Sequence, residues 1–233
     1  MSRPHAWTKL LGRAAVFAAC GLPLALIGFD ALGGRLGANP IATIMNRLGY
    51  WTLFFLLLSL VPTPLKTLFG WTSPVRFRRM LGLFAFFYAC LHLGTYVGVD
   101  QFFDLPAIAA DIVKRKFITI GLLAFLLLLP LAITSTDRWV RRLGFVRWKR
   151  LHRLSYLAAI CGVIHFTWRV KADLREPMIF AAALAGLFAV RLLAPLVLRS
   201  GPGTARAESV ARAQELGRLR IDLARSSCGE ARS

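Results

Sequence analysis

Three of the four histidines lie inside long apolar stretches, where an ionisable side chain is costly unless it has a partner or a function. These are His92, His152 and His165, whereas His5 stands in the polar N-terminal segment. Imidazole nitrogens ligate metals, and two of them can hold the iron of a b-type haem from opposite sides. The ordinary alternative is a histidine that only hydrogen-bonds to a neighbouring helix. Three such residues together favour metal ligation.

Helix geometry predicts that two of these histidines lie at the same depth. His92 follows Arg78 by 14 residues and His165 follows Trp148 by 17, so at about 1.5 Å per residue both lie roughly 20–25 Å along their helices. Matched depth on two helices, with an apolar slot between them, is what a bis-histidine haem requires. His92 and His165 are therefore the predicted axial ligands of one haem.

His152 is predicted to lie at a second, inner level. It precedes His165 by 13 residues, or about 20 Å of helix, and the matching level of the other helix holds Arg78 and Arg79 instead of an imidazole. Thirteen residues at about 100° each also put His152 and His165 on different faces of an undistorted helix. We expect His152 to bind an inner haem or to position a flavin.

Zinc and covalently attached haem fit the sequence less well. A zinc site gathers three or four ligands at one depth, whereas these histidines divide between two levels. The four cysteines form no CxxC or CxxCH motif, which argues against a zinc site, a redox dithiol and c-type haem. Their positions are Cys20, Cys90, Cys161 and Cys228.

The segments that carry these residues are apolar enough to lie in a membrane. The chain of 233 residues is 57% hydrophobic and only 18% charged, against about a quarter charged in soluble domains. Spanning a bilayer takes about 20 apolar residues in a helix, and the run after Arg13 resembles a retained first helix more than a cleaved signal peptide. We predict an all-α polytopic bundle of six transmembrane helices, at 13–31, 48–69, 78–99, 117–134, 148–169 and 177–198.

The net charge of +19 reflects topology better than a nucleic-acid partner. Of the 30 Lys and Arg, 21 lie in the N-terminal segment, in the loops 62–79 and 135–153, and in the tail from Arg199. The alternate segments hold eight. Because cytoplasmic loops are enriched in Lys and Arg, we predict a multi-pass protein of the bacterial inner membrane with both termini in the cytoplasm.

Three arginines and the C-terminal tail have two interpretations each. Arg78, Arg79 and Arg191 are ordinary topological or interfacial charges, or they bind a haem propionate or a flavin phosphate. We divide the chain into a membrane domain at 1–200 and a polar, basic cytoplasmic tail at 201–233. The tail forms an amphipathic helix on the anionic inner leaflet or is partly disordered.

Two histidine-bearing segments resemble a known family. One is residues 78–88, RRMLGLFAFFY, continuing to LHL at 91–93. The other is residues 148–157, WKRLHRLSYL, continuing to HF at 165–166. With TPL at 63–65 and PLAITS at 130–135, the chain to about residue 198 is similar to the MsrQ (YedZ) family of haem-binding membrane subunits.

The resemblance implies a ferric-reductase-like transmembrane domain, related to the membrane part of NADPH oxidases, with b-type haem and bound FMN. It implies that electrons from the quinol pool, or from a cytoplasmic flavin reductase, reach a periplasmic molybdenum-containing partner, MsrP. That partner reduces methionine sulfoxide in oxidised periplasmic proteins. His92, His152 and His165 match the family's histidines, and Arg78 stands where the oxidase relatives have a fourth.

The sequence thus predicts an electron-transfer subunit of an oxidoreductase complex, distinct from the catalytic subunit, with one or two haems b and FMN. Membrane lipid surrounds it, nucleic acid is not a partner, and without a nucleotide-binding domain it would not take hydride from NADPH unaided. One alternative is a self-sufficient transmembrane ferric reductase. Another is a small transporter or assembly factor whose histidines only bond between helices, which would carry no haem absorbance.

Overall fold

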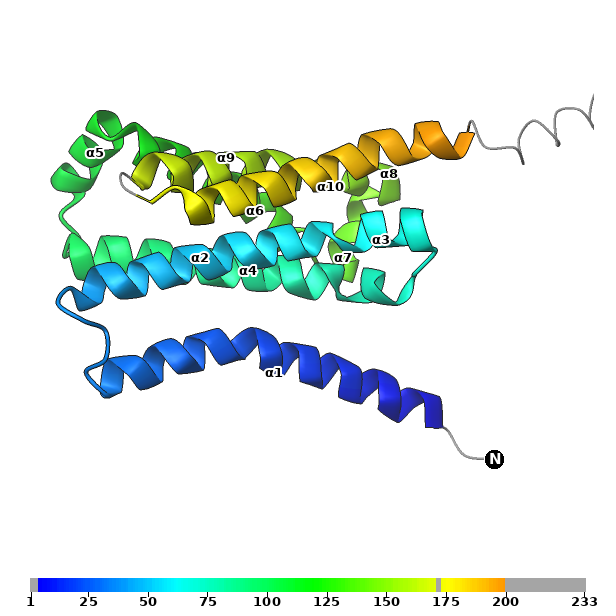
Figure 1. The fold of residues 1–233 in the computed structure, drawn as a ribbon, viewed down its shortest axis with the longest axis horizontal. Coiled ribbons are helices and arrows are strands. Elements are labelled where there is room, and N and C mark those ends of the chain that lie inside the picture. Colours follow the sequence, from blue (N-terminus) through cyan, green and yellow to red (C-terminus); the bar gives the residue numbers. More distant parts are fainter. Residues whose placement is uncertain (1–3, 171–172, 200–233) are drawn as a thin grey trace, which may run out of the picture. The chain divides into compact units, whose positions relative to one another are not determined.

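A computed structural model describes residues 4–170 and 173–199 of the chain. Within these ranges every element is a helix and none is a strand, which confirms the all-α prediction (Figure 1). The elements are α1 (Pro4–Leu32), α2 (Pro40–Leu60), α3 (Pro62–Phe69), η1 (Ser73–Phe77), α4 (Arg78–Gly94), η2 (Thr95–Asp100), α5 (Leu105–Lys114), α6 (Lys116–Ile133), α7 (Asp137–Leu143), α8 (Phe145–Leu151), α9 (Leu154–Arg169) and α10 (Arg175–Arg199).

The chain divides into two compact units, residues 1–188 and 189–233. The first unit contains α1 to α9 and the beginning of α10. Of the second unit, the structure describes the remainder of α10 as far as Arg199. The predicted tail at 201–233 lies outside the described residues, so the proposed domain boundary stays a prediction.

Five helical segments of the described residues are long and apolar enough to cross a membrane: Leu10–Leu32, Pro40–Phe69, Ser73–Asp100, Lys116–Ile133 and Arg175–Ala194. They correspond to five of the six predicted spans. The sixth, 148–169, is not confirmed as one span, because the chain there forms part of α8, a turn at His152 and Arg153, and then the 16 residues of α9. Sixteen residues rise only about 24 Å, against a hydrocarbon core of about 30 Å.

Two antiparallel helix pairs make up the centre of the first unit. α2 pairs with α4, and α6 pairs with α9 (Figure 1). Small residues allow close approach, since Ala85 on α4 and Ala158 and Ala159 on α9 are completely buried. Helices in lipid associate by such close van der Waals packing. Each pair therefore presents one histidine-bearing helix, α4 or α9, held against a partner helix.

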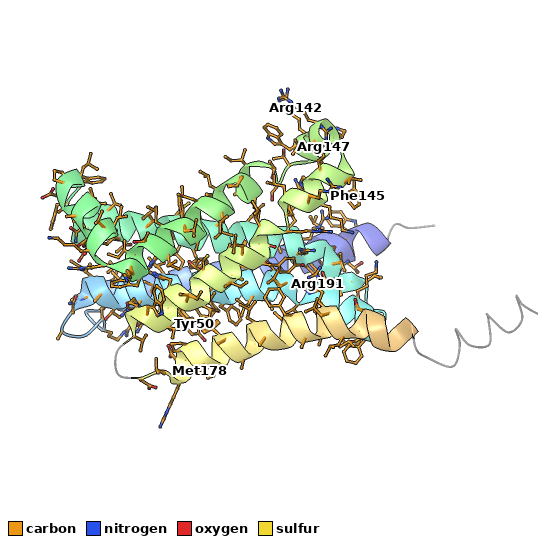
Figure 2. All side chains as sticks on the ribbon, turned by 90° about the horizontal axis from the view of Figure 1, so that it is seen from above. Tyr50, Arg142, Phe145, Arg147, Met178 and Arg191 are labelled. Atoms are coloured by element: carbon orange, nitrogen blue, oxygen red, sulfur yellow. The ribbon has the colours of Figure 1, made fainter. Side chains whose placement is uncertain are left out.

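The short elements gather at the two ends of the helix pairs, the α5 end and the α7–α8 end. At the α7–α8 end, Arg142 and Arg147 project away from the bundle (Figure 2), and both side chains are exposed. At the α5 end, α4 continues as the π-helix η2, and Phe102 and Phe103 then turn the chain with φ of 46° and 62°. Asp104 begins α5 by accepting a hydrogen bond from the Ala107 amide at 3.0 Å. These turns fold α5 back against the end of the bundle.

α1 contacts α4 beside the proline in its interior. Pro23 lies inside α1 and has no N–H to donate, and the helix bends along its length (Figure 1). The Tyr88 hydroxyl lies beside this proline: it accepts from the Leu24 amide at 3.1 Å and donates to the Cys20 carbonyl at 2.9 Å. The Tyr88 side chain is completely buried. One hydroxyl therefore bonds the backbone on both sides of Pro23 and joins α1 to α4.

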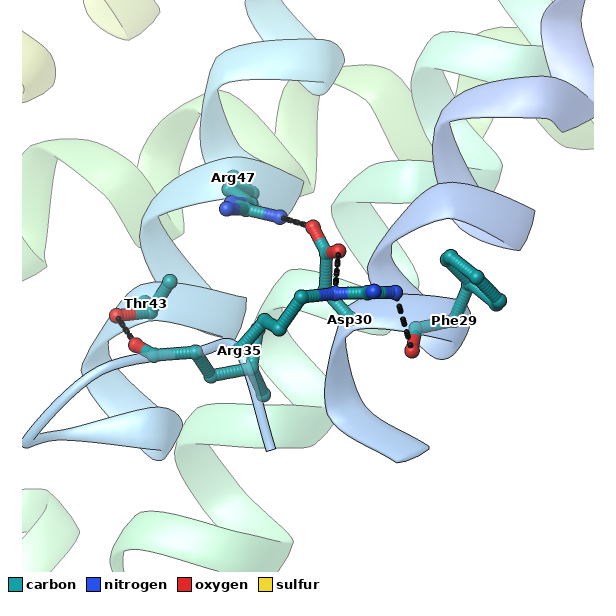
Figure 3. Close-up of polar contacts among 6 residues, drawn as sticks. Phe29, Asp30, Arg35, Thr43 and Arg47 are labelled. Atoms are coloured by element: carbon teal, nitrogen blue, oxygen red, sulfur yellow. Dashed lines mark hydrogen bonds and ion pairs between the residues drawn. The ribbon is translucent and has the colours of Figure 1, made fainter. Parts of the chain in front are cut away.

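Charged side chains hold the connection between α1 and α2 (Figure 3). Asp30 accepts from Arg47 at 2.6 Å and from Arg35 at 3.2 Å. Thr43 donates its hydroxyl proton to the Leu36 carbonyl at 2.9 Å. α2 itself begins with Pro40, a favoured first-turn residue. The start of α2 is thereby fixed, which positions the next turns of the helix beside α4.

Candidate functional site

The structure brings His92 and His165 together from opposite helix pairs. His92 extends from α4 and His165 from α9, and the ring centroids are 6.1 Å apart with the planes at 80°. A metal lies about 2 Å from an imidazole nitrogen and the ring centre about 1 Å further, so two imidazoles on one metal ion have centres about 6 Å apart. The spacing of these rings fits two axial ligands of one iron.

A backbone carbonyl orients each of the two rings. His92 Nδ1 lies 2.8 Å from the Met45 carbonyl oxygen of α2, and His165 Nδ1 lies 2.7 Å from the Phe117 carbonyl oxygen of α6. A carbonyl oxygen only accepts hydrogen bonds, so each Nδ1 must donate and carry the proton. Each Nε2 then has its lone pair free, as a ligating imidazole requires.

A cavity of about 500 Å³ lies between the two helix pairs and is lined by both histidines. Its deeper wall is apolar, with Leu53 and Leu56 of α2 and Phe125 and Leu128 of α6. Cofactor sites are commonly apolar cavities of 300–1,000 Å³ with a few placed polar groups. The volume and the apolar wall fit a flat hydrophobic macrocycle.

Polar groups line this cavity at the α5 end: Asn46, Tyr96, Asp100, Arg115 and Arg169. Arg169 donates a short hydrogen bond to the Asn46 side chain, which links α9 to α2. Arg115 pairs with Asp111 at 3.2 Å, and the Tyr96 hydroxyl donates to the same carboxylate at 3.1 Å. Two guanidinium groups at one end of an apolar cavity are suited to a ligand that has carboxylates on one edge.

His152 lies apart from this cavity, at the α7–α8 end. It is the residue that ends α8, its Nδ1 lies 3.1 Å from the Trp148 carbonyl oxygen, and the Trp148 ring stacks on it with centroids 3.9 Å apart. His152 Nε2 is buried with no hydrogen-bond partner among the described residues. The backbone of Leu131 lies near the His152 ring. The predicted separation of His152 from the other two histidines is therefore observed.

The arginines predicted as cofactor ligands divide between two places. Arg78 and Arg79 begin α4 and are near enough to His152 for their charges to act on it, although no hydrogen bond joins either of them to His152 in the described part of the chain. We call these three residues the inner cluster. Arg79 also pairs with Asp137 of α7 at 2.6 Å, and Arg78 lies 3.5 Å from the Thr63 hydroxyl. Arg191, by contrast, is a partly buried residue of α10 in the second unit, and its proposed role stays a prediction.

The donor groups around His152 do not decide between the predicted inner haem and the predicted flavin, so both stay predictions. A bis-histidine haem needs two imidazoles, whereas His152 is accompanied there by Arg78 and Arg79. The described residues contain no group of three or more His, Cys, Asp or Glu side chains that could hold a metal ion. The arginines of the inner cluster suit an anion such as a phosphate.

Several residues of the site were not identified from the sequence. Arg115 and Arg169 were counted only as topological charges, although both line the cavity. Gly49 of α2 and Gly121 of α6 also line it, each packed against a histidine ring. A glycine in an apolar span was the available signal, because glycine in a helix interior is destabilising unless close approach requires it.

Comparisons with known proteins agree with this geometry. Residues 45–163, which include most of α2, all of α4 and α6, and most of α9, match the family model described as "Ferric reductase like transmembrane component". Three relatives are each named "Protein-methionine-sulfoxide reductase heme-binding subunit MsrQ". The relative from Rhodospirillum rubrum is 60% identical over 195 residues, which cover 84% of this chain and 93% of the relative. That from Herminiimonas arsenicoxydans is 49% identical (76% and 82% covered), and that from Caulobacter vibrioides is 47% identical (82% and 90% covered).

The match covers most of each protein, and the matched family segment contains α4 with His92 and most of α9. The resemblance drawn from the histidine-bearing segments is confirmed. This chain belongs to the MsrQ family of heme-binding subunits of protein-methionine-sulfoxide reductase, within the ferric-reductase-like transmembrane proteins.

Proposed function

We propose that this chain carries electrons across the bacterial inner membrane to a periplasmic, molybdenum-containing methionine-sulfoxide reductase. His92 and His165 hold haem b, and the electrons come from the quinol pool or from a cytoplasmic flavin reductase. The end product is the repair of oxidised periplasmic proteins. In this proposal the chain is the electron-transfer subunit and its partner is the catalytic subunit.

The observation that carries the proposal is the pair of imidazole rings, His92 and His165, whose centroids are 6.1 Å apart. Each ring donates a hydrogen bond from Nδ1 to a backbone carbonyl oxygen. Haem supplies reversible one-electron chemistry when it is bound. The residues of the chain supply two ligands of fixed orientation, an apolar wall that excludes water, and Arg115 and Arg169 for the two propionates. The relatives named as heme-binding subunits of protein-methionine-sulfoxide reductase support a separate catalytic partner.

We further propose that the inner cluster of His152, Arg78 and Arg79 binds FMN through its phosphate. Forked arginine donors suit phosphate oxygens. The unpaired His152 Nε2 and the stacked Trp148 ring supply a polar and an aromatic contact nearby. This places the flavin at the end that the Lys and Arg distribution assigns to the cytoplasm, where a reductase would deliver electrons.

An absorbance spectrum of protein purified after haem-replete expression tests the proposal. We expect a b-type Soret band that shifts on reduction with dithionite, and FMN in the same preparation. His92→Ala and His165→Ala should each lose most of the haem, whereas the matched variant His152→Ala should keep that haem and lose FMN. Wild-type protein without a reducible Soret band, or full haem content in both ligand variants, would contradict the haem assignment.

The match to the ferric-reductase-like family model supports a second candidate function, a ferric reductase that acts without a protein partner. The same purified protein distinguishes the two functions. If it is reduced and then mixed with a ferric chelate or with the molybdoenzyme, the proposed function predicts faster reoxidation by the protein partner. Faster reoxidation by the chelate would favour the ferric reductase.

A further inference from the structure

The two candidate ligand histidines are held by the same local arrangement on two different helix pairs. His92 bonds to the carbonyl of Met45, and Gly49 follows one helical turn later on α2. His165 bonds to the carbonyl of Phe117, and Gly121 follows one helical turn later on α6. In both pairs the glycine precedes its histidine by nearly the same length of chain. Repetition on separate helices argues against a chance packing contact.

Each glycine leaves open the space that the imidazole ring occupies. A Cβ added to Gly121 would lie 2.6 Å from His165 Nδ1 and 2.8 Å from its Cε1. A Cβ added to Gly49 would lie 3.1 Å from His92 Cε1 and 3.2 Å from its Nδ1. The contact at Gly121 would be far inside van der Waals distance, whereas the contact at Gly49 would only be tight. The ring of His165 therefore depends more strongly on its glycine than the ring of His92 does.

Helix geometry explains why the glycine stands one turn after the carbonyl. Side chains of a helix tilt toward its N-terminus, so the side chain of residue i+4 covers the carbonyl of residue i. That carbonyl already accepts the amide of residue i+4, but its oxygen has a second lone pair. With glycine at i+4, a ring from a neighbouring helix can reach that lone pair.

We propose that Gly49 and Gly121 are positioning residues, which admit the His92 and His165 rings to the carbonyls of Met45 and Phe117 and so set the orientation and donor strength of both ligands. The inference rests on the proposed haem function and adds residues that act through the ligands. A hydrogen bond from Nδ1–H to an oxygen makes an imidazole a stronger donor at Nε2. A stronger donor favours oxidised iron, so these bonds lower the midpoint potential of the haem.

Gly121→Ala and Gly49→Ala test the proposal in the full-length purified protein. For Gly121→Ala we expect the affinity for haem to fall about ten-fold, as it does when a residue that orients a metal ligand is changed. The ratio of haem to protein at limiting haem measures this affinity. The haem that remains should have a higher midpoint potential and an altered low-spin EPR spectrum. Gly49→Ala should change both quantities in the same direction and by less, since its added carbon meets the ring at 3.1 Å instead of 2.6 Å. If Gly121→Ala does not fold, the milder variant still gives the measurement.

Three other glycines provide controls. Gly82 of α4 and Gly186 of α10 have open space at the Cβ position, so Gly82→Ala and Gly186→Ala should match wild type. Gly162 of α9 would bring an added Cβ to 3.1 Å from a methyl carbon of Leu53. Gly162→Ala thus crowds the same cavity as tightly as Gly49→Ala does but without touching an imidazole, so its midpoint potential and EPR spectrum should change less than those of Gly49→Ala.

Two results would overturn the inference. One is Gly121→Ala and Gly49→Ala proteins with wild-type midpoint potential and EPR spectrum, which would reduce both glycines to general packing. The other is an equal shift in Gly162→Ala, which would show that any crowding between these helices has the same effect. Both results presuppose a haem in the wild-type protein, whereas failure of the proposed function would appear as a wild-type protein without haem.

Discussion

Tyr88 joins two helices through a single oxygen atom. Its hydroxyl accepts from Leu24 and donates to Cys20, on either side of Pro23 in α1. Backbone groups in lipid have no water to bond, so the Leu24 amide and the Cys20 carbonyl each need a partner within the protein. The contact makes the shape of α1 depend on a side chain of α4, one turn before His92.

We expect Tyr88→Phe to destabilise the folded protein by about 0.6–1.7 kcal/mol, the average and upper values measured for hydrogen bonds between membrane helices. Either α1 must straighten, or the Cys20 carbonyl and the Leu24 amide lose their partner. Thermal unfolding of the detergent-solubilised protein measures this effect. Tyr50→Phe is the control, since within the described part of the chain the Tyr50 hydroxyl makes no hydrogen bond. Equal melting temperatures for Tyr88→Phe and wild type would refute the bridging role.

For single residues, the sequence predicts the position along a helix well and the contacts of the side chain poorly. The rise per residue was enough to pair His92 with His165 and to separate His152. The carbonyl that each ring meets depends on how α2 and α6 are rotated, which no local pattern encodes. Arg169 was likewise assigned only to topology, because its contact with Asn46 joins residues far apart in the chain.

At the scale of elements, the main departure from prediction is the break between α8 and α9. Hydropathy predicts one helix over 148–169. The observed turn at His152 and Arg153 is supported by tertiary contacts: the Trp148 indole donates to the Thr134 carbonyl at the end of α6, at 2.9 Å. Because α8 and α9 are separate helices, counting 100° per residue from His165 to His152 does not apply. A contact to another helix outweighs the local preference, and sequence periodicity cannot reveal it.

The contact between α7 and the start of α4 depends on pH. The Arg79 guanidinium lowers the pKa of the Asp137 carboxyl below its ordinary value by donating to it at 2.6 Å. A lowered folded-state pKa means that the pair stabilises the protein above the ordinary pKa and stops doing so as the pH falls through the lowered value. The effect is small, because the Asp137 side chain is 77% exposed.

Asp137→Asn should therefore lower the melting temperature slightly at neutral pH. The difference from wild type should vanish when the pH is taken below the lowered pKa, because both proteins are then uncharged at this position. Raising the salt concentration at neutral pH should also reduce it, since salt screens exposed charges. Melting curves of the two proteins across pH and salt provide the measurement. A difference that persists unchanged in acid would exclude the ion pair as its cause.

At the scale of the whole molecule, the two ends of the first unit can be assigned to the two sides of the membrane from their exposed residues. The α7–α8 end has exposed basic residues such as Arg142 and Arg147 (Figure 2). The α5 end has the exposed Phe102 and Phe103. Lys and Arg mark the cytoplasmic side and aromatic residues occur at both interfaces. The α7–α8 end is therefore the predicted cytoplasmic side.

Single cysteines at exposed positions test this orientation. In a Cys228→Ser background, Phe102→Cys at the α5 end should react with a membrane-impermeant thiol reagent in spheroplasts. Phe145→Cys at the α7–α8 end should react only after lysis. The two wild-type side chains are 80% and 65% exposed, so accessibility to water is comparable. Reaction of Phe145→Cys in intact spheroplasts would contradict the predicted topology and the proposed direction of electron flow.

The contact beside Pro23 has a consequence for biogenesis. α1 is synthesised before α4, so the hydroxyl that bonds the Cys20 carbonyl and the Leu24 amide is absent until Tyr88 has been synthesised. Until then the Leu24 amide can bond the Cys20 carbonyl within a straighter helix. Otherwise water or protein at the translocon must bond both groups. The final packing of α1 against α4 therefore forms only after α4 has been synthesised.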